Sequence, residues 1–226
     1  MFKAILFDLD NTLIDFVQMK EMSCKAAIAA MVGGGFPLDE KKAYKELFAL
    51  YGVHGIENTT IFQKFLQKFL GHVDYRLLAK GISAYRKVQS SFLEPYPDVR
   101  STLIKLKEKG LLLGIVSDAP RLKAWTRLGE TKLEDFFDVV ITLGDTKKLK
   151  PHKSPFQKAI NSLQINPKEI LFVGDNPRRD ILGAKKAGMK TALAKYGQVF
   201  EGKEIIADFE LNHFSELLKI INEKQK

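Results

Sequence analysis

The chain has 226 residues, 45% of them hydrophobic, and its 36 Lys and Arg against 27 Asp and Glu give a formal net charge of +9. This length and apolar content are sufficient for a packed core, and they suit one α/β domain with a sizeable insertion or two small domains. No apolar run approaches the ~20 residues of a membrane span, and the single cysteine, Cys24, excludes an internal disulfide and any cysteine cluster.

The first element is an almost continuous apolar run from Ala4 to Phe7, which predicts a strand buried on both faces of a parallel sheet. Two acids, Asp8 and Asp10, follow it directly. Ligands of open α/β sheets bind beyond the carboxyl ends of the strands, so we expect both acids at the mouth of a site. There, one carboxylate could attack an electrophile or bind a hard cation, while the other transfers a proton.

Residues 16–93 have helical periodicity and no strand pattern, and helices are predicted over 16–31, 39–51, 61–70 and 74–92. The apolar residues of the third helix fall on one face, which predicts a small core within this block. The triplet Gly33–Gly35 follows a helix and not a strand, so we expect it to end that helix and not to bind phosphate.

After Pro95, predicted helices and strands alternate. The helices cover 99–109, 124–128, 154–163, 179–187 and 214–220, and the strands cover 111–116, 139–143, 170–173, 191–194 and 206–209. This alternation predicts right-handed βαβ crossovers and a parallel sheet. We therefore expect a Rossmann-like α/β three-layer core formed by residues 1–15 and 94–226, with an all-helical domain of residues 16–93 inserted after the first strand.

Four of the predicted strands end in polar side chains. These side chains are Asp8 and Asp10, Ser117 and Asp118, Asp145, and Asp175. Carboxylates that gather at one edge of a sheet repel each other, so an oxygen-ligated Mg²⁺ is the expected occupant. Lys150 follows the third of these strands and could neutralise a group that is transferred there.

The sequence resembles the four motifs of the haloacid dehalogenase (HAD) superfamily of phosphohydrolases. In chain order, the matching residues are the segment from Asp8 to Thr12 (DLDNT), Ser117, Lys150-Pro151, and Gly174-Asp175 with Asp180. The resemblance covers the α/β core, and the helical block resembles the C1-type cap of that family. It implies that Asp8 is the nucleophile that forms an aspartyl phosphate. Asp10 is implied as the general acid for the leaving oxygen and then as the base that activates water.

The same resemblance implies a Mg²⁺ site formed by Asp8, Asp175 and the main-chain carbonyl of Asp10. Ser117 and Lys150 are implied to bind the phosphoryl oxygens, and Asp180 to orient the water shell of the metal.

Two positions in the motifs bear on the chemistry. Asp118 follows Ser117 where family members often carry Asn, which leaves the charge of the phosphate pocket open. Asp10 is present, whereas the true dehalogenases of the family lack this second acid. The second acid favours phosphate esters over carbon–halogen bonds, because only an alkoxide leaving group needs a proton.

We expect a Mg²⁺-dependent phosphatase that hydrolyses a small phosphorylated metabolite. Two alternatives stay open: a phosphomutase that transfers the same phosphoryl group to a second hydroxyl, and a non-enzymatic binding module. The substrate, the cap residues that face the site, and the choice between monomer and homodimer cannot be predicted from the sequence.

The basic charge does not by itself indicate a nucleic-acid partner. The lysines are interleaved with glutamates, as in residues 105–109, which is typical of solvated helix faces, and a positive field also attracts phosphorylated substrates. The four apolar residues that follow Lys3 are too few for a signal peptide, and the single cysteine suits a reducing compartment, so we expect a cytoplasmic protein.

Three further side chains receive structural predictions. Trp125 is expected in the core between helix and sheet, and Arg178 and Arg179 are expected to form salt bridges within their own loop.

Overall fold

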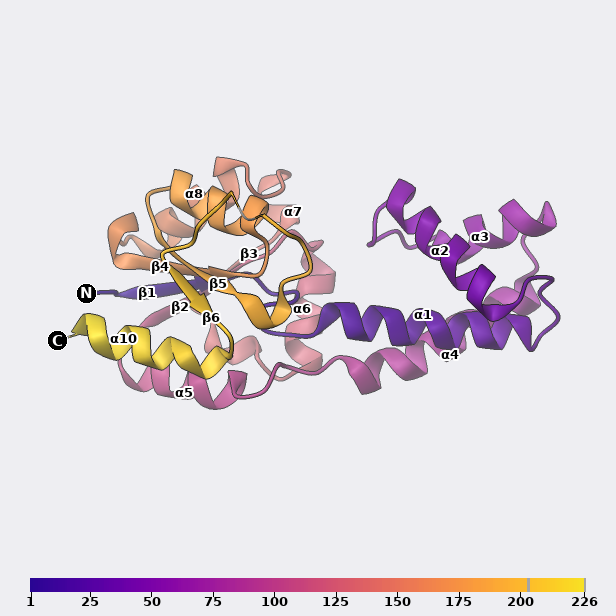
Figure 1. Ribbon diagram of the computed structural model, residues 1–226, viewed down its shortest axis with the longest axis horizontal. Coiled ribbons are helices and arrows are strands. Elements are labelled where there is room, and N and C mark those ends of the chain that lie inside the picture. Colours follow the sequence, from indigo (N-terminus) through magenta and orange to yellow (C-terminus); the bar gives the residue numbers. More distant parts are fainter. Residues whose placement is uncertain (203, 226) are drawn as a thin grey trace. The chain divides into compact units, whose positions relative to one another are not determined.

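The computed structural model describes residues 1–202 and 204–225. Contacts divide the chain into two compact units (Figure 1): unit 1 comprises Met1–Asp15 with Glu94–Lys226, and unit 2 comprises Phe16–Leu93. Among the described residues, no helix combines the length and the apolar composition that a membrane span requires.

Unit 1 is built on a six-stranded sheet with the order β3-β2-β1-β4-β5-β6, in which every neighbouring pair is parallel. The strands are β1 (Ala4–Phe7), β2 (Leu112–Val116), β3 (Val139–Ile141), β4 (Ile170–Gly174), β5 (Lys190–Ala194) and β6 (Phe209–Leu211). All four residues of β1 are buried, as expected for a central parallel strand covered on both faces.

The position of β1 determines where the site lies. Phe7 pairs with Ile115 of β2 on one side and with Val173 of β4 on the other, so the three strands end at nearly the same level. The strand order reverses between β1 and β4, and in such sheets ligands bind in the crevice at the carboxyl ends of the strands beside this reversal.

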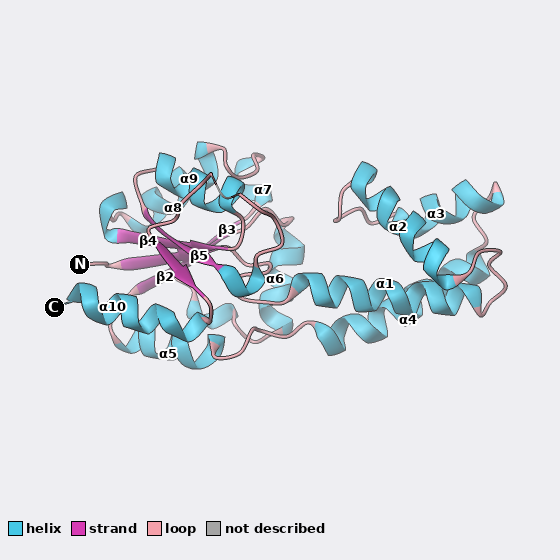
Figure 2. Cartoon of the chain, in the orientation of Figure 1, coloured by secondary structure: helices cyan, strands magenta, loops and turns pink. Residues whose placement is uncertain are grey.

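Helices cover both faces of the sheet (Figure 2). They are α5 (Val99–Glu108), α6 (Arg121–Glu130), α7 (Leu143–Thr146), α8 (Lys153–Leu163), α9 (Leu182–Lys186) and α10 (Leu217–Gln225). On one face Phe172 of β4 packs on Phe156 of α8 with ring centroids 5.2 Å apart, and on the other Phe7 packs on Phe214, just before α10, at 5.8 Å. The predicted three-layer α/β fold is confirmed.

Unit 2 contains only helices: α1 (Phe16–Val32), α2 (Glu40–His54), α3 (Ile61–Leu70) and α4 (Tyr75–Phe92). Asp39 and Asp74 cap the second and fourth helices with their carboxylates. Phe65 of α3 is completely buried and stacks at 4.8 Å on Phe36, within an apolar cluster formed entirely by residues of this unit. The function of unit 2 as a cap stays a prediction.

The structure contradicts the predictions for Trp125 and for the start of the last strand. Trp125 is 44% exposed, because α6 buries its other face, which carries Ala124 and Leu128. The last strand begins at Phe209 and not at Ile206. The carboxylate of Asp208 accepts hydrogen bonds from the backbone N–H and the hydroxyl of Thr191, so strand pairing with β5 starts only after Asp208.

A chemical test of the core of unit 2 uses Cys24, which is completely buried. Burial raises the pKa of its thiol to about 11, although the nearby Lys20 opposes this effect. Because the thiolate is the reactive form, iodoacetamide at mildly alkaline pH should leave the folded protein unlabelled and should label it fully in denaturant. Mass spectrometry measures both, and stoichiometric labelling of the folded protein would contradict the buried position.

Candidate active site

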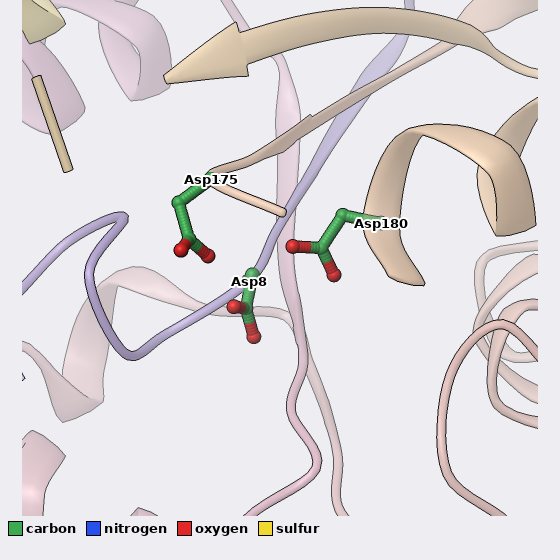
Figure 3. Close-up of side chains that lie close together, drawn as sticks. All are labelled: Asp8, Asp175 and Asp180. Atoms are coloured by element: carbon green, nitrogen blue, oxygen red, sulfur yellow. The ribbon is translucent and has the colours of Figure 1, made fainter. Parts of the chain in front are cut away.

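Three carboxylates meet at the carboxyl edge of the sheet (Figure 3). Asp8 follows β1 directly, Asp175 follows β4 directly, and Asp180 belongs to a π-helical turn, Pro177–Ile181. One oxygen from each lies within 4.8 Å of the others, and the three residues are 3%, 0% and 0% exposed. The adjacency of β1 and β4 therefore brings together acids that are far apart in the sequence.

The turn after β4 places Asp180 accurately. The side-chain oxygen of Asn176 accepts hydrogen bonds from the backbone N–H groups of Arg178 and Arg179. The backbone N–H of Asn176 donates to Asp180 Oδ2 at 3.0 Å. A Cβ atom on Gly174 would lie 2.5 Å from the Cβ of Asp180, so this close approach requires glycine.

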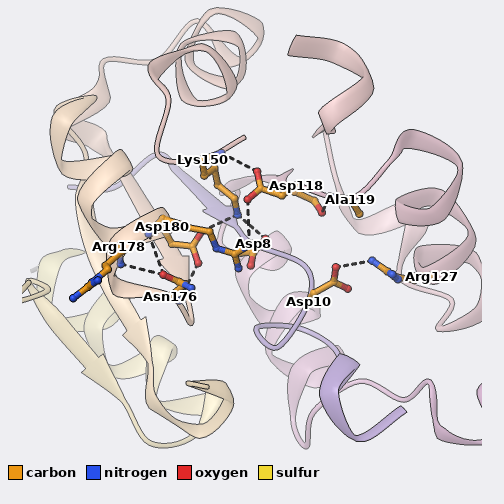
Figure 4. Close-up of polar contacts among 11 residues, drawn as sticks. Asp8, Asp10, Asp118, Ala119, Arg127, Lys150, Asn176, Arg178 and Asp180 are labelled. Atoms are coloured by element: carbon orange, nitrogen blue, oxygen red, sulfur yellow. Dashed lines mark hydrogen bonds and ion pairs between the residues drawn. The ribbon is translucent and has the colours of Figure 1, made fainter. Parts of the chain in front are cut away.

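Lys150 is the central cation of the site (Figure 4). Its Nζ donates to Asp8 Oδ1 at 2.6 Å and lies 2.7 Å from Asp180 Oδ1, and the lysine itself is 3% exposed. Burial alone would lower the pKa of Lys150, but the carboxylates of Asp180 and Asp8 outweigh burial and raise it above its ordinary value. Lys150 is therefore held as a cation.

Asp175 is the one of the three clustered acids whose two carboxylate oxygens both lack a hydrogen-bond partner among the described residues. Both of these oxygens are buried. Burial, together with the neighbouring Asp180 and Asp8, raises the pKa of Asp175 to about 9. A buried carboxylate without donors is costly unless a cation binds it, so this group is the clearest candidate for a metal ligand.

Sequence reasoning missed a second cation, Arg179. It does not pair within its own loop as predicted: its Nη1 lies 3.4 Å from Asp118 Oδ2 after β2, while Arg178 pairs with Glu204. Asp118 also accepts the backbone N–H of Lys150 at 2.9 Å. The carboxylate of Asp118, which stands where the family often has Asn, is therefore paired with an arginine between the two acids of the fourth motif.

A count of formal charges describes the site. When all four are ionised, the carboxylates of Asp8, Asp118, Asp175 and Asp180 exceed the two cations, Lys150 and Arg179, by two negative charges. A divalent cation would neutralise this excess, and the oxygen donors are those that Mg²⁺ prefers.

Asp10 points in a different direction from Asp8 and Asp180 (Figure 4). Its Oδ2 accepts a hydrogen bond from Arg127 Nη1 of α6 at 2.5 Å. Asn11, which follows it, has a positive φ of 59° and turns the chain sharply. The two acids of the first motif are therefore separated into different environments, one with Lys150 and one with Arg127.

Ser117 lies at the end of β2 and is 4% exposed. Its Oγ accepts a hydrogen bond from the backbone N–H of Ala119 at 3.0 Å, and no described residue accepts from its hydroxyl. The hydroxyl can therefore donate to an anion at the edge of the sheet.

Asp145 is predicted at the same edge of the sheet, but its carboxylate caps a helix instead. It forms a capping box with Thr142 at the start of α7, and its Oδ1 pairs with Arg121 at 2.5 Å. The strand β3 therefore adds no carboxylate to the cluster of Asp8, Asp175 and Asp180.

Comparisons with known proteins agree with this geometry. The family model described as haloacid dehalogenase-like hydrolase matches residues 5–194. The chain is 34% identical to a glyceraldehyde 3-phosphate phosphatase of Pyrococcus furiosus, over 97% of this chain and 92% of that protein. It is 35% identical to the pyrophosphatase PpaX of Bacillus cereus, over 97% and 96%. The crystal structure of a HAD phosphatase from Thermococcus onnurineus superposes with a TM-score of 0.70 at 28% identity, covering 97% and 98% of the two chains. On these matches, the chain belongs to the haloacid dehalogenase-like hydrolases.

Proposed function

We propose that this chain is a Mg²⁺-dependent phosphatase of small phosphorylated metabolites that works through an aspartyl phosphate on Asp8. The observation that carries the proposal is the buried ion pair in which Lys150 Nζ lies 2.6 Å from Asp8 Oδ1. Lys150 occupies one carboxylate oxygen of Asp8, so the other oxygen can act as the nucleophile.

In the first step, a carboxylate oxygen of Asp8 forms a bond to phosphorus as the bond from phosphorus to the leaving oxygen breaks. Asp10 donates a proton to that leaving oxygen. In the second step, Asp10 takes a proton from water, whose oxygen attacks phosphorus and displaces Asp8. The different partners of Asp8 and Asp10 suit these different tasks.

Lys150 and Ser117 are proposed to bind the phosphoryl oxygens, the first with charge and the second with its hydroxyl. Asp8 and Asp175, with the main-chain carbonyl of Asp10, would hold Mg²⁺, and Asp180 would orient its water shell. Support comes from the unpartnered oxygens of Asp175 and from the excess of two negative charges at the site. When bound, the ion supplies positive charge that offsets the charge of the phosphoryl group.

The relatives do not indicate one substrate for this chain. A glyceraldehyde 3-phosphate phosphatase and a pyrophosphatase have nearly the same sequence identity to it, 34% and 35%. We propose that unit 2 is the cap domain that selects among such substrates. The two segments that lead to it are joined within unit 1, where the N–H of Asp15 donates to the carbonyl of Glu94 at 3.2 Å. A location in the cytoplasm, inferred from the single cysteine, belongs to the same proposal.

The activity is tested with a panel of glyceraldehyde 3-phosphate, pyrophosphate, glycolate phosphate and a hexose phosphate, in Mg²⁺. We expect phosphate release by the wild type and a loss of about 1,000-fold or more in Asp8→Asn, because the nucleophile is removed. Asp135→Asn, which changes an exposed acid of unit 1, is the matched control and should retain full activity.

Three outcomes would contradict the assignment. Retention of more than a few per cent of the activity in Asp8→Asn would exclude the nucleophile. Isomerisation of the hexose phosphate without phosphate release would indicate a mutase. Absence of release from every ester would favour a binding module.

The metal site is tested by thermal unfolding of Asp175→Asn. In excess chelator the variant should be more stable than the wild type, because it lacks a buried carboxylate without donors. The folded wild type holds the proton of Asp175 more tightly than the unfolded chain does, with a pKa of about 9. The stability of the chelated wild type should therefore fall as the pH rises from about 4 towards this value, and this part of the pH dependence should vanish in the variant.

Added Mg²⁺ should reverse the order of stability. At 100 times its dissociation constant it should stabilise the wild type by about 2.7 kcal/mol and the variant much less. Equal responses of both proteins to chelator and to Mg²⁺ would show that Asp175 is not a ligand.

A further inference from the structure

Arg179 is a cation of the acid cluster that no step of the proposed reaction uses. It lies directly before Asp180 in the turn after β4, and its backbone N–H donates to the side-chain oxygen of Asn176 at 3.1 Å. Its Nη1 lies 3.4 Å from Oδ2 of Asp118, which directly follows Ser117 at the end of β2. The guanidinium therefore lies between the end of β2 and the turn after β4.

The contact with Asp118 satisfies few of the donors of this guanidinium. An arginine side chain has five N–H donors, and the bond to Asp118 is longer than the ~3.2 Å that usually limits such bonds. Arg179 Nε is buried and has no hydrogen-bond partner among the described residues. A buried donor is costly to leave unpaired, so this nitrogen is suited to a ligand that supplies an acceptor.

The two cations of the site differ in their access to solvent. The side chain of Lys150 is 1% exposed and is shared by Asp8 and Asp180, whereas that of Arg179 is 39% exposed. A molecule that enters from solvent can therefore contact Arg179. Burial alone would lower the pKa of Arg179, but the neighbouring carboxylates raise it, and that of Asp8 has the largest effect. Arg179 is thus a cation in the surroundings of the proposed nucleophile.

We infer that Arg179 binds the phosphoryl group that is transferred to Asp8, together with Lys150 and Ser117. The planar guanidinium can donate two parallel hydrogen bonds, one from Nε and one from an Nη, to two oxygens of one phosphoryl group, which an ammonium cannot do. The inference rests on the proposed phosphatase function, and it adds a charged phosphoryl ligand that is not one of the motif residues.

The alternative is that Arg179 only neutralises Asp118. Family members often carry Asn at the position of Asp118, so an arginine that accompanies the extra acid would restore the charge and do nothing more. The two roles differ once the acid is removed. A merely compensating arginine is then dispensable, whereas a phosphoryl ligand is still needed.

The experiment measures the dissociation constants of Mg²⁺ alone, and of inorganic phosphate in the presence of Mg²⁺, by isothermal titration calorimetry. In Arg179→Met, phosphate should bind about 10- to 100-fold more weakly, because charge-assisted hydrogen bonds are lost. Mg²⁺ should bind at least as tightly as in the wild type, because the site loses a positive charge. In an Asp118→Asn background, Arg179→Met should still weaken phosphate binding by about 10-fold or more.

Arg178→Met is the matched control. It removes the neighbouring arginine of the same turn, whose side chain pairs with Glu204, and both dissociation constants should keep their wild-type values. Arg179→Lys keeps the charge without the planar fork, and its affinity for phosphate should lie between those of the wild type and Arg179→Met. If Arg179→Met does not fold, Arg179→Lys decides by the same comparison in both backgrounds.

Two binding results would overturn the inference. An unchanged affinity for phosphate on changing Arg179 in the Asp118→Asn background would show that the arginine only compensates the acid. Weaker binding of both phosphate and Mg²⁺ in Arg179→Met would show that it only supports the structure of the site.

The substrate panel separates the remaining outcomes. Because every substrate contains the transferred group, Arg179→Met should slow the hydrolysis of all of them, and a loss confined to pyrophosphate would instead place Arg179 against the leaving group and overturn the inference. A wild type that binds phosphate through Arg179 but hydrolyses no substrate would refute the proposed function alone.

Discussion

The ammonium group of Lys150 lies between two carboxylates, 2.6 Å from Asp8 and 2.7 Å from Asp180, and all three side chains are almost completely buried. A single ion in such a place would be very costly, and only close pairing makes its burial tolerable. The rest of the site depends on this contact. It orients the carboxylate of Asp8 and keeps the turn after β4 close to the end of β1, and it still leaves the carboxylate of Asp175 without a hydrogen-bond donor among the described residues.

The fold supplies this contact by topology. Parallel strands that share a central β1 bring Asp8, Ser117 and Asp175 to one edge, although the chain between them contains a complete helical unit. Local contacts then fix the position of Asp180. Gly174 has no Cβ that would clash with Asp180, and Asn176 forms hydrogen bonds within the turn that contains Asp180. Ionising all four carboxylates of the cluster without a metal would be electrostatically costly to the folded chain, and such costs are typical of functional sites. The resulting excess of negative charge makes a divalent cation and a phosphoryl group suitable ligands together.

Much of this arrangement could be predicted from the sequence, since buried parallel strands are apolar runs and their ends are visible as acids. Asp8 and Asp175 follow from this pattern, and the parallel sheet brings them together. Lys150 is predicted differently, from its match with Pro151 to a family motif. The pairs of Asp10 with Arg127 and of Asp118 with Arg179 could not be predicted, because contacts between residues 117 and 61 positions apart have no local periodicity. Asp145 could have been assigned correctly, as Thr142 three residues before it forms the pattern of a capping box. Trp125 was misplaced because the short helix α6 buries an arginine on its inner face, which the hydrophobic pattern does not indicate.

The central proposal, that Asp8 is the nucleophile, is tested most directly by trapping the covalent intermediate. The protein is mixed with Mg²⁺ and a phosphate ester labelled in its phosphoryl group, quenched in acid within the first turnover, and digested for peptide mapping. The account predicts a labelled peptide that contains Asp8, formed and lost at least as fast as phosphate is released. Phosphate release without any labelled peptide, or a label on a different peptide, would contradict it.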